Sequence, residues 1–245
     1  MNIEYNFFLL IFIILLIMLT ILYPISGVKV INKLKKSYGD GSTNRKVGFY
    51  RETILWSWFP LLLIFLLIPI SNIGLADIGL KWIQIDFSSL SKWIVYPVIG
   101  FYLLHLFQNI YYIIVFKINN EKREKVAKGI ADDFKWFLPI TKKEKLVWNY
   151  LSISAGITEE ILYRGYFFFA LAIIFPALNL VSILLVSTLI FGIGHIYLGK
   201  EVIKSTLLGL IFGIYFIVFD SVIPVIIIHI TQDLVLRDII VEEFE

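Results

Sequence analysis

The 245-residue sequence contains no cysteine, only three histidines and only 17% charged residues. The absence of cysteine excludes disulfide bonds, cysteine-ligated metal sites and thiol catalysis. The charged fraction is low, because soluble domains carry about 25% charged residues. We find no Gly-x-Ser-x-Gly turn, which argues against serine catalysis. We also find no base-stacking or groove-reading element, so a nucleic-acid partner is not expected.

Apolar residues are abundant: they make up 59% of the sequence, and the mean hydropathy is +0.84. Soluble domains contain about 45–50% apolar residues, so this composition is typical of a membrane protein with several spans. A spanning helix needs about 20 mostly apolar residues. The runs that qualify are 5–25, 53–73, 93–116, 146–175, 181–198, 202–219 and 222–236. The sequence therefore predicts an all-α bundle of about seven transmembrane helices, with the first run retained rather than cleaved as a signal peptide.

The basic residues indicate an orientation for this bundle. Every Lys and Arg except Lys81, Lys92 and Arg164 falls in a segment that the seven-span layout places on one side of the membrane. Loops rich in Lys and Arg face the cytoplasm. We therefore expect the N-terminus outside and the C-terminus in the cytoplasm.

The only extended polar region is residues 117–145. Its apolar side chains recur at helical spacing, as Val126, Ile130, Phe134 and Phe137. This pattern predicts either an amphipathic helix on the membrane surface or a solvated linker helix.

The fourth apolar run carries three ionisable residues within six positions, Glu159, Glu160 and Arg164. A charge at bilayer depth costs at least about 2.5–3.5 kcal/mol, and it marks a functional site by default. Glu160 and Arg164 stand four residues apart in acid-before-base order, which predicts an ion pair that braces the helix. Glu159 projects about 100° away from Glu160 on a helix. It has no local cation, and its desolvation suits a general base.

Three further polar residues belong to later runs. His195 lies near the end of the fifth, and His229 and Asp233 are one turn apart on the seventh. All three fall in the cytoplasmic half, where one cavity shared with Glu159 is feasible. Glu159 and His195 would then activate a water while His229 and Asp233 hold an oxyanion. Alternatively, the two histidines and a carboxylate bind a divalent metal such as zinc, which lowers the pKa of its bound water.

Two other patterns favour contacts between helices. His105, Gln108 and Asn109 form a polar stripe on the third run, for which we expect interhelical packing. Gly209 and Gly213 form a small-xxx-small pair on the sixth run, and we expect a close helix contact there rather than dimerisation.

The intramembrane polar residues fall into three motifs, which are Glu159-Glu-Ile-Leu-Tyr-Arg164, Phe191-Gly-Ile-Gly-His195 and His229-Ile-Thr-Gln-Asp233. Their order and their placement on apolar helices resemble the CPBP family of intramembrane proteases. That family comprises the CAAX prenyl endopeptidases and the bacteriocin-processing, or Abi, proteins. The resemblance covers about residues 142–236.

The resemblance implies a role for each motif residue. Glu159 would be the catalytic base, His195 and His229 would line the site, and Asp233 would help to bind the oxyanion. A carboxylate donates a hydrogen bond only when it is protonated, so an ionised Asp233 would instead orient His229 or ligate a metal. The residues expected to support the site are Glu160, Arg164, Tyr163 and Phe191.

The resulting hypothesis is a membrane endopeptidase that uses a Glu-activated water, with or without a metal. Its partners would be the lipid bilayer and a hydrophobic or membrane-associated peptide, such as a pheromone, leader peptide or bacteriocin. The composition favours a bacterial plasma membrane. The parts expected are N-terminal helices with basic loops (1–141), a catalytic core (142–240) and an acidic tail (241–245). The alternatives are a proton-coupled transporter and a catalytically silent scaffold or immunity protein.

Overall fold

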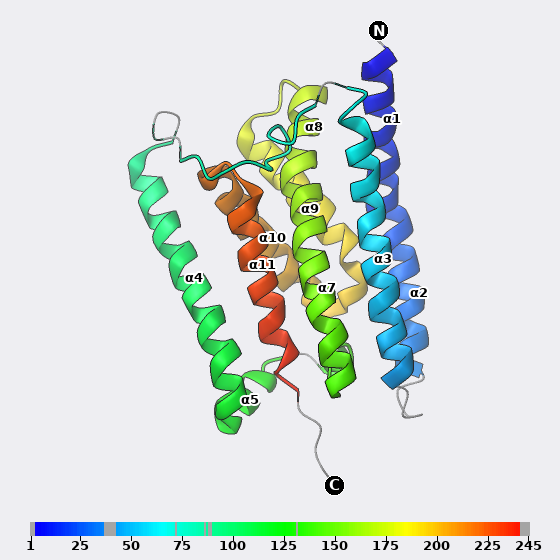
Figure 1. Cartoon of the computed structure of the whole chain (residues 1–245), viewed down its shortest axis with the longest axis vertical. Coiled ribbons are helices and arrows are strands. Elements are labelled where there is room, and N and C mark those ends of the chain that lie inside the picture. The colour runs from blue at the N-terminus through cyan, green and yellow to red at the C-terminus, as the bar shows by residue number, and fades with distance from the viewer. Residues whose placement is uncertain are drawn as a thin grey trace.

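The computed structural model describes residues 3–36, 43–71, 73–85, 87, 90–130 and 132–240. These residues form helices and their connections, and no strand occurs among them (Figure 1). The prediction of an all-α fold is therefore confirmed. The predicted acidic tail, residues 241–245, lies outside the described residues.

The helices form a bundle in which successive long elements run up and down (Figure 1). The elements of the first half are α1 (Ile3–Ile17), the π-helical stretch η1 (Met18–Leu22), α2 (Tyr23–Lys36), α3 (Thr43–Leu67), α4 (Lys92–Ile118), α5 (Asn120–Ala127) and α6 (Asp132–Lys135). Those of the second half are α7 (Lys142–Glu160), the π-helical stretch η3 (Ile161–Tyr166), α8 (Phe167–Ile174), α9 (Leu180–Gly194), the 3₁₀ stretch η4 (Ile196–Glu201), α10 (Val202–Phe219) and α11 (Val222–Arg237).

Among the described residues, four helical stretches are long and apolar enough to cross a membrane. They are Tyr5–Lys33, Asn44–Leu67, Lys92–Ile118 and Ile196–Phe219, and Leu180–Gly194 is a shorter apolar helix. Large apolar side chains point outward from them, including Phe107 on α4, which is 69% exposed. An outer surface of this kind suits lipid rather than water. The protein is therefore a multi-pass membrane protein.

The helix that carries the first motif begins at a capping box. Thr141 Oγ1 accepts from the backbone N–H of Glu144, and Glu144 Oε2 accepts from that of Thr141. From there α7, η3 and α8 run on without interruption as far as Ile174. The π-helical turn begins directly after Glu160, and such turns are frequent at functional sites.

Glycines set the closest helix contacts around this element. A Cβ on Gly156 would lie 2.5 Å from Cγ1 and 3.3 Å from the backbone nitrogen of Ile230, so α11 packs directly on the backbone of α7 at this glycine. A Cβ on Gly209 would lie 2.9 Å from the ring of Phe191, and one on Gly213 would meet Leu184. The predicted role of these two glycines in helix contact is confirmed.

Residues 117–145 differ from the expected single helix. The chain turns at Gly129, whose N–H bonds to the carbonyl of Val126, and this turn separates α5 from α6. The side chains of Val126, Ile130, Phe134 and Phe137 pack on a buried cluster that includes Trp148 and Val235. The helical spacing therefore reflects burial of these side chains against the bundle. Two short helices joined by a turn bury them as well as one continuous helix would.

Candidate active site

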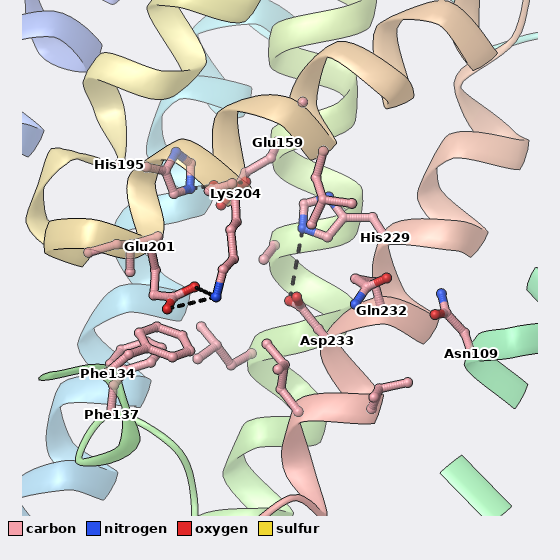
Figure 2. Close-up of a pocket in the computed structure, with 18 of the residues that line it drawn as sticks. Asn109, Phe134, Phe137, Glu159, His195, Glu201, Lys204, His229, Gln232 and Asp233 are labelled. Carbon is pink, nitrogen blue, oxygen red and sulfur yellow. Dashed lines mark hydrogen bonds and ion pairs between the residues drawn. The ribbon is translucent and has the colours of Figure 1, made fainter. Parts of the chain in front are cut away.

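A cavity of about 430 Å³ lies between α7, α10 and α11, with the α5–α6 segment along one side. All four residues predicted as catalytic line it, namely Glu159, His195, His229 and Asp233. Figure 2 shows them facing one another from α7, the end of α9, and α11. The tertiary structure thus brings together residues that are up to 74 positions apart in the chain.

His195 is held at the C-terminal cap of α9. Its Nδ1 lies 2.8 Å from the carbonyl oxygen of Phe191, four residues earlier. Because a carbonyl oxygen can only accept, Nδ1 carries the proton and Nε2 of the neutral ring has a free lone pair. Nε2 lies 3.6 Å from Oε2 of Glu159. Two acceptors therefore face each other across a gap that a water molecule can bridge.

The predicted ion pair between Glu160 and Arg164 is present and buried. Arg164 Nη1 lies 2.9 Å from Glu160 Oε1, with the two side chains 2% and 0% exposed. The same Oε1 lies 2.6 Å from Nδ1 of His229. Glu160 therefore does more than pair with Arg164. It also holds the ring of His229 so that Nε2 of His229 points toward the cavity. This contact joins residues 69 positions apart, and no local spacing predicts it.

Asp233 stands one turn beyond His229 on α11. Its Oδ2 lies 3.9 Å from His229 Nε2, which is longer than a hydrogen bond. Its backbone carbonyl accepts from Nε1 of Trp148 at 2.9 Å, and this bond ties the motif on α11 to α7. Both Asp233 and His229 Nε2 are thus positioned by other atoms and face the cavity with their reactive atoms free of each other.

The remaining predicted support residues form the wall behind the cavity. The guanidinium of Arg164 lies 4.8 Å from the centre of the Phe191 ring, and its Nη2 donates to the carbonyl of Gly209 at 2.8 Å. Phe191 also packs on His195, with ring centres 4.2 Å apart. Tyr163 is buried, with its ring centre 5.0 Å from that of Phe191, and it is not among the residues that line the cavity. Phe191 lines the cavity and supports His195.

The geometry does not fit the predicted metal site. Within the described ranges, no group of three His, Asp or Glu side chains is arranged to hold a metal ion. The donors fall into two pairs, Glu159 with His195 and His229 with Asp233, so the two predicted histidine ligands belong to different pairs. We therefore derive no step through a metal.

Sequence reasoning missed several residues that line the cavity. Lys204 and Glu201 form an ion pair of 3.0 Å at its edge (Figure 2). In the sequence, Lys204 is explained by the positive-inside rule alone. Nothing in the sequence therefore indicated that it would line the cavity. The stripe of His105 and Asn109 on α4 bonds to α11, as predicted, and also lines the cavity.

Part of the chain matches a known protein family. Residues 142–235 match the family model of the type II CAAX prenyl endopeptidase Rce1-like proteins. This segment contains the three motifs and all four residues predicted as catalytic. A search of curated proteins and a search of solved structures found no match. The resemblance predicted from the motifs is thus confirmed: residues 142–235 carry an Rce1-like domain, consistent with the CPBP family, and the match supports a membrane endopeptidase in general.

Proposed function

We propose that the protein is an intramembrane endopeptidase in which Glu159 activates a water molecule to hydrolyse a peptide bond. Its substrate is a hydrophobic or membrane-associated peptide, such as a pheromone, leader peptide or bacteriocin. The observation that carries this proposal is the gap of 3.6 Å between Glu159 Oε2 and His195 Nε2, in the cavity that also contains His229 and Asp233. Two acceptors at this separation can both accept a hydrogen bond from one water and orient its oxygen toward a substrate.

The reaction would proceed by general base catalysis. Glu159 takes a proton from the water, and the water oxygen forms a bond with the carbonyl carbon while the carbonyl π electrons move to its oxygen. Glu160 accepts from Nδ1–H of His229, so in this step His229 is the imidazolium, whose second proton, on Nε2, donates to this oxygen. The carbon–nitrogen bond then breaks as Glu159 returns its proton to the leaving amine. Asp233 lies 3.9 Å from the same Nε2, and its negative charge, when ionised, would stabilise the imidazolium without taking this hydrogen bond.

We further infer seven membrane spans, with the N-terminus outside and the C-terminus cytoplasmic. The start of α1 and the end of α11 lie at opposite ends of the bundle, which supports an odd number of crossings (Figure 1). The basic loops lie at the end where α11 finishes. Cleavage would then occur in the cytoplasmic half of a membrane, and the composition favours a bacterial plasma membrane.

The variant Glu159→Gln tests the proposed base. We expect the full-length variant, purified in nanodiscs, to cleave quenched-fluorescent hydrophobic peptides about 10²–10⁴-fold more slowly than the wild type. Its thermal unfolding should stay close to that of the wild type, because Glu159 is not part of the buried ion pair. Normal cleavage by this variant would disprove the base assignment.

Cells allow the same variant to reveal the substrate. Membrane peptides from cells with the wild type are compared by mass spectrometry with those from cells with Glu159→Gln. Peptides that shorten only in the presence of the wild-type protein identify the substrate and its cleavage position. Identical peptide sets would count against a protease.

A further inference from the structure

A chain of three polar side chains enters the cavity from α4 and α10, outside the pairs described above. Tyr215 on α10 has its hydroxyl 3.2 Å from Nδ1 of His105 on α4. Nε2 of His105 lies 2.9 Å from Oε1 of Gln232 on α11. His105 and Gln232 line the cavity, and Gln232 immediately precedes Asp233 in the chain. Helix α4 lies outside residues 142–235, so the family match does not include His105.

The placement of these atoms gives one consistent set of donors and acceptors. The amide oxygen of Gln232 can only accept, so Nε2 of His105 carries the proton of the neutral ring. Nδ1 of His105 then accepts from the Tyr215 hydroxyl. With its oxygen engaged by His105, Gln232 has its side-chain NH₂ free to donate on the cavity side. Figure 2 shows this amide beside Asp233 and His229.

The hydrolysis gains from a second hydrogen-bond donor beside His229, and four other groups near the site do not supply one. Glu159 and Asp233 accept when they are ionised, and Nε2 of the neutral His195 also accepts. Arg164 is close by, but its guanidinium is buried and bonded to Glu160 and to the carbonyl of Gly209. A preorganised N–H aimed at the developing oxyanion stabilises the transition state, and amide side chains are among the usual donors.

We propose that the side-chain N–H of Gln232 donates to the substrate carbonyl oxygen and stabilises its negative charge as the water attacks. His105 and Tyr215 are positioning residues, which hold the amide of Gln232 with its NH₂ toward the substrate. This inference rests on the proposed function, because it assigns a second donor, beside His229, to the same reaction.

A packing role for the same contacts makes a different prediction. Helix α4 also bonds to α11 through the hydroxyl of Tyr102, which donates to the carbonyl of Pro224 at 3.1 Å and is not among the cavity-lining residues. If His105 only joined the two helices, removal of either contact would have the same consequence. If His105 acts through Gln232, only the His105 contact affects the chemical step.

The test uses full-length protein in nanodiscs and measures kcat, KM and thermal unfolding with a quenched-fluorescent hydrophobic peptide. Gln232→Met keeps the size of the side chain and removes the donor, and we expect kcat to fall about 10²–10³-fold with little change in KM. His105→Ala should lower kcat less, and the double variant should be no slower than Gln232→Met alone, because His105 acts through Gln232. Tyr102→Phe is the matched control and should retain the wild-type kcat.

Each other outcome has a defined meaning. A wild-type kcat in Gln232→Met would overturn this inference and leave the proposed function intact. Equal losses of kcat in Tyr102→Phe and His105→Ala would show that the His105 contact only packs the two helices together. Additive losses of kcat in the double variant His105→Ala/Gln232→Met would show the same. Absence of Glu159-dependent cleavage by the wild type would overturn the proposed function and this inference together.

Discussion

Adjacent residues do different work in this site because a helix turns each side chain to a new direction. Glu159 faces the cavity and His195, whereas Glu160 is fully buried between Arg164 and His229. The two carboxylates are identical in chemistry and next to each other in sequence. Their surroundings alone leave one carboxylate facing the cavity and bury the other between two partners.

Glu160→Gln tests this difference. The substitution leaves the guanidinium of Arg164 buried without its counter-charge, and breaking a buried pair in this way costs about 3–5 kcal/mol. We expect a clear fall in thermal stability in detergent, larger than that caused by Glu159→Gln. The double variant Glu160→Gln/Arg164→Met should regain part of the loss, because it removes the uncompensated charge. A Glu160→Gln protein as stable as the wild type would contradict the structural role of the pair.

At the scale of elements, α7 determines the geometry of the site through its contact with α11. Gly156 lies one helical turn before Glu160, and its missing side chain allows the backbone of α11 to approach. This approach places His229 within reach of Glu160. A larger separation of the two helices would lengthen that hydrogen bond and the contact between Trp148 and Asp233 together.

A matched pair of substitutions tests this contact. In Gly156→Ala, the new Cβ would stand 2.5 Å from Ile230, and such overpacking costs about 1–3 kcal/mol. In Gly100→Ala on α4, the new Cβ has no neighbour within 4 Å among the described atoms, and the substitution favours the helix by about 0.4–1 kcal/mol. We expect thermal unfolding to occur at a lower temperature in the first variant and not in the second. Equal effects would show that the close approach is unimportant.

At the scale of the whole molecule, the absence of cysteine makes the proposed orientation directly testable. Single cysteines can be introduced at Ile83, in the connection between α3 and α4, and at Lys125 on α5, which are both exposed. In intact cells, a membrane-impermeant maleimide should label Ile83→Cys, and it should label Lys125→Cys only after lysis. The reverse pattern would invert the topology, and labelling of both in intact cells would refute the separation of the two loops by the membrane.

Composition and local spacing were sufficient to predict much of this protein. Apolar runs predicted the helices and the membrane, because lipid allows few polar side chains. The spacing of Glu160 and Arg164 predicted their ion pair, since residues four apart on a helix are neighbours whatever surrounds them. The three motifs predicted the family match of residues 142–235 and four residues that line one cavity. Apart from the motifs, the parts that were predictable are those in which a residue and its partner lie within one turn of the same helix, or in which composition alone decides.

Only the tertiary structure decided which distant residues meet. His229 bonds to Glu160, 69 positions away, and Gln232 bonds to His105, 127 positions away. Residues 117–145 contain the two short helices α5 and α6, whose apolar side chains pack on a buried cluster of the bundle. Such contacts depend on how closely whole helices approach and how they are rotated. These quantities are set by packing over the entire bundle, and no local pattern in the sequence contains them.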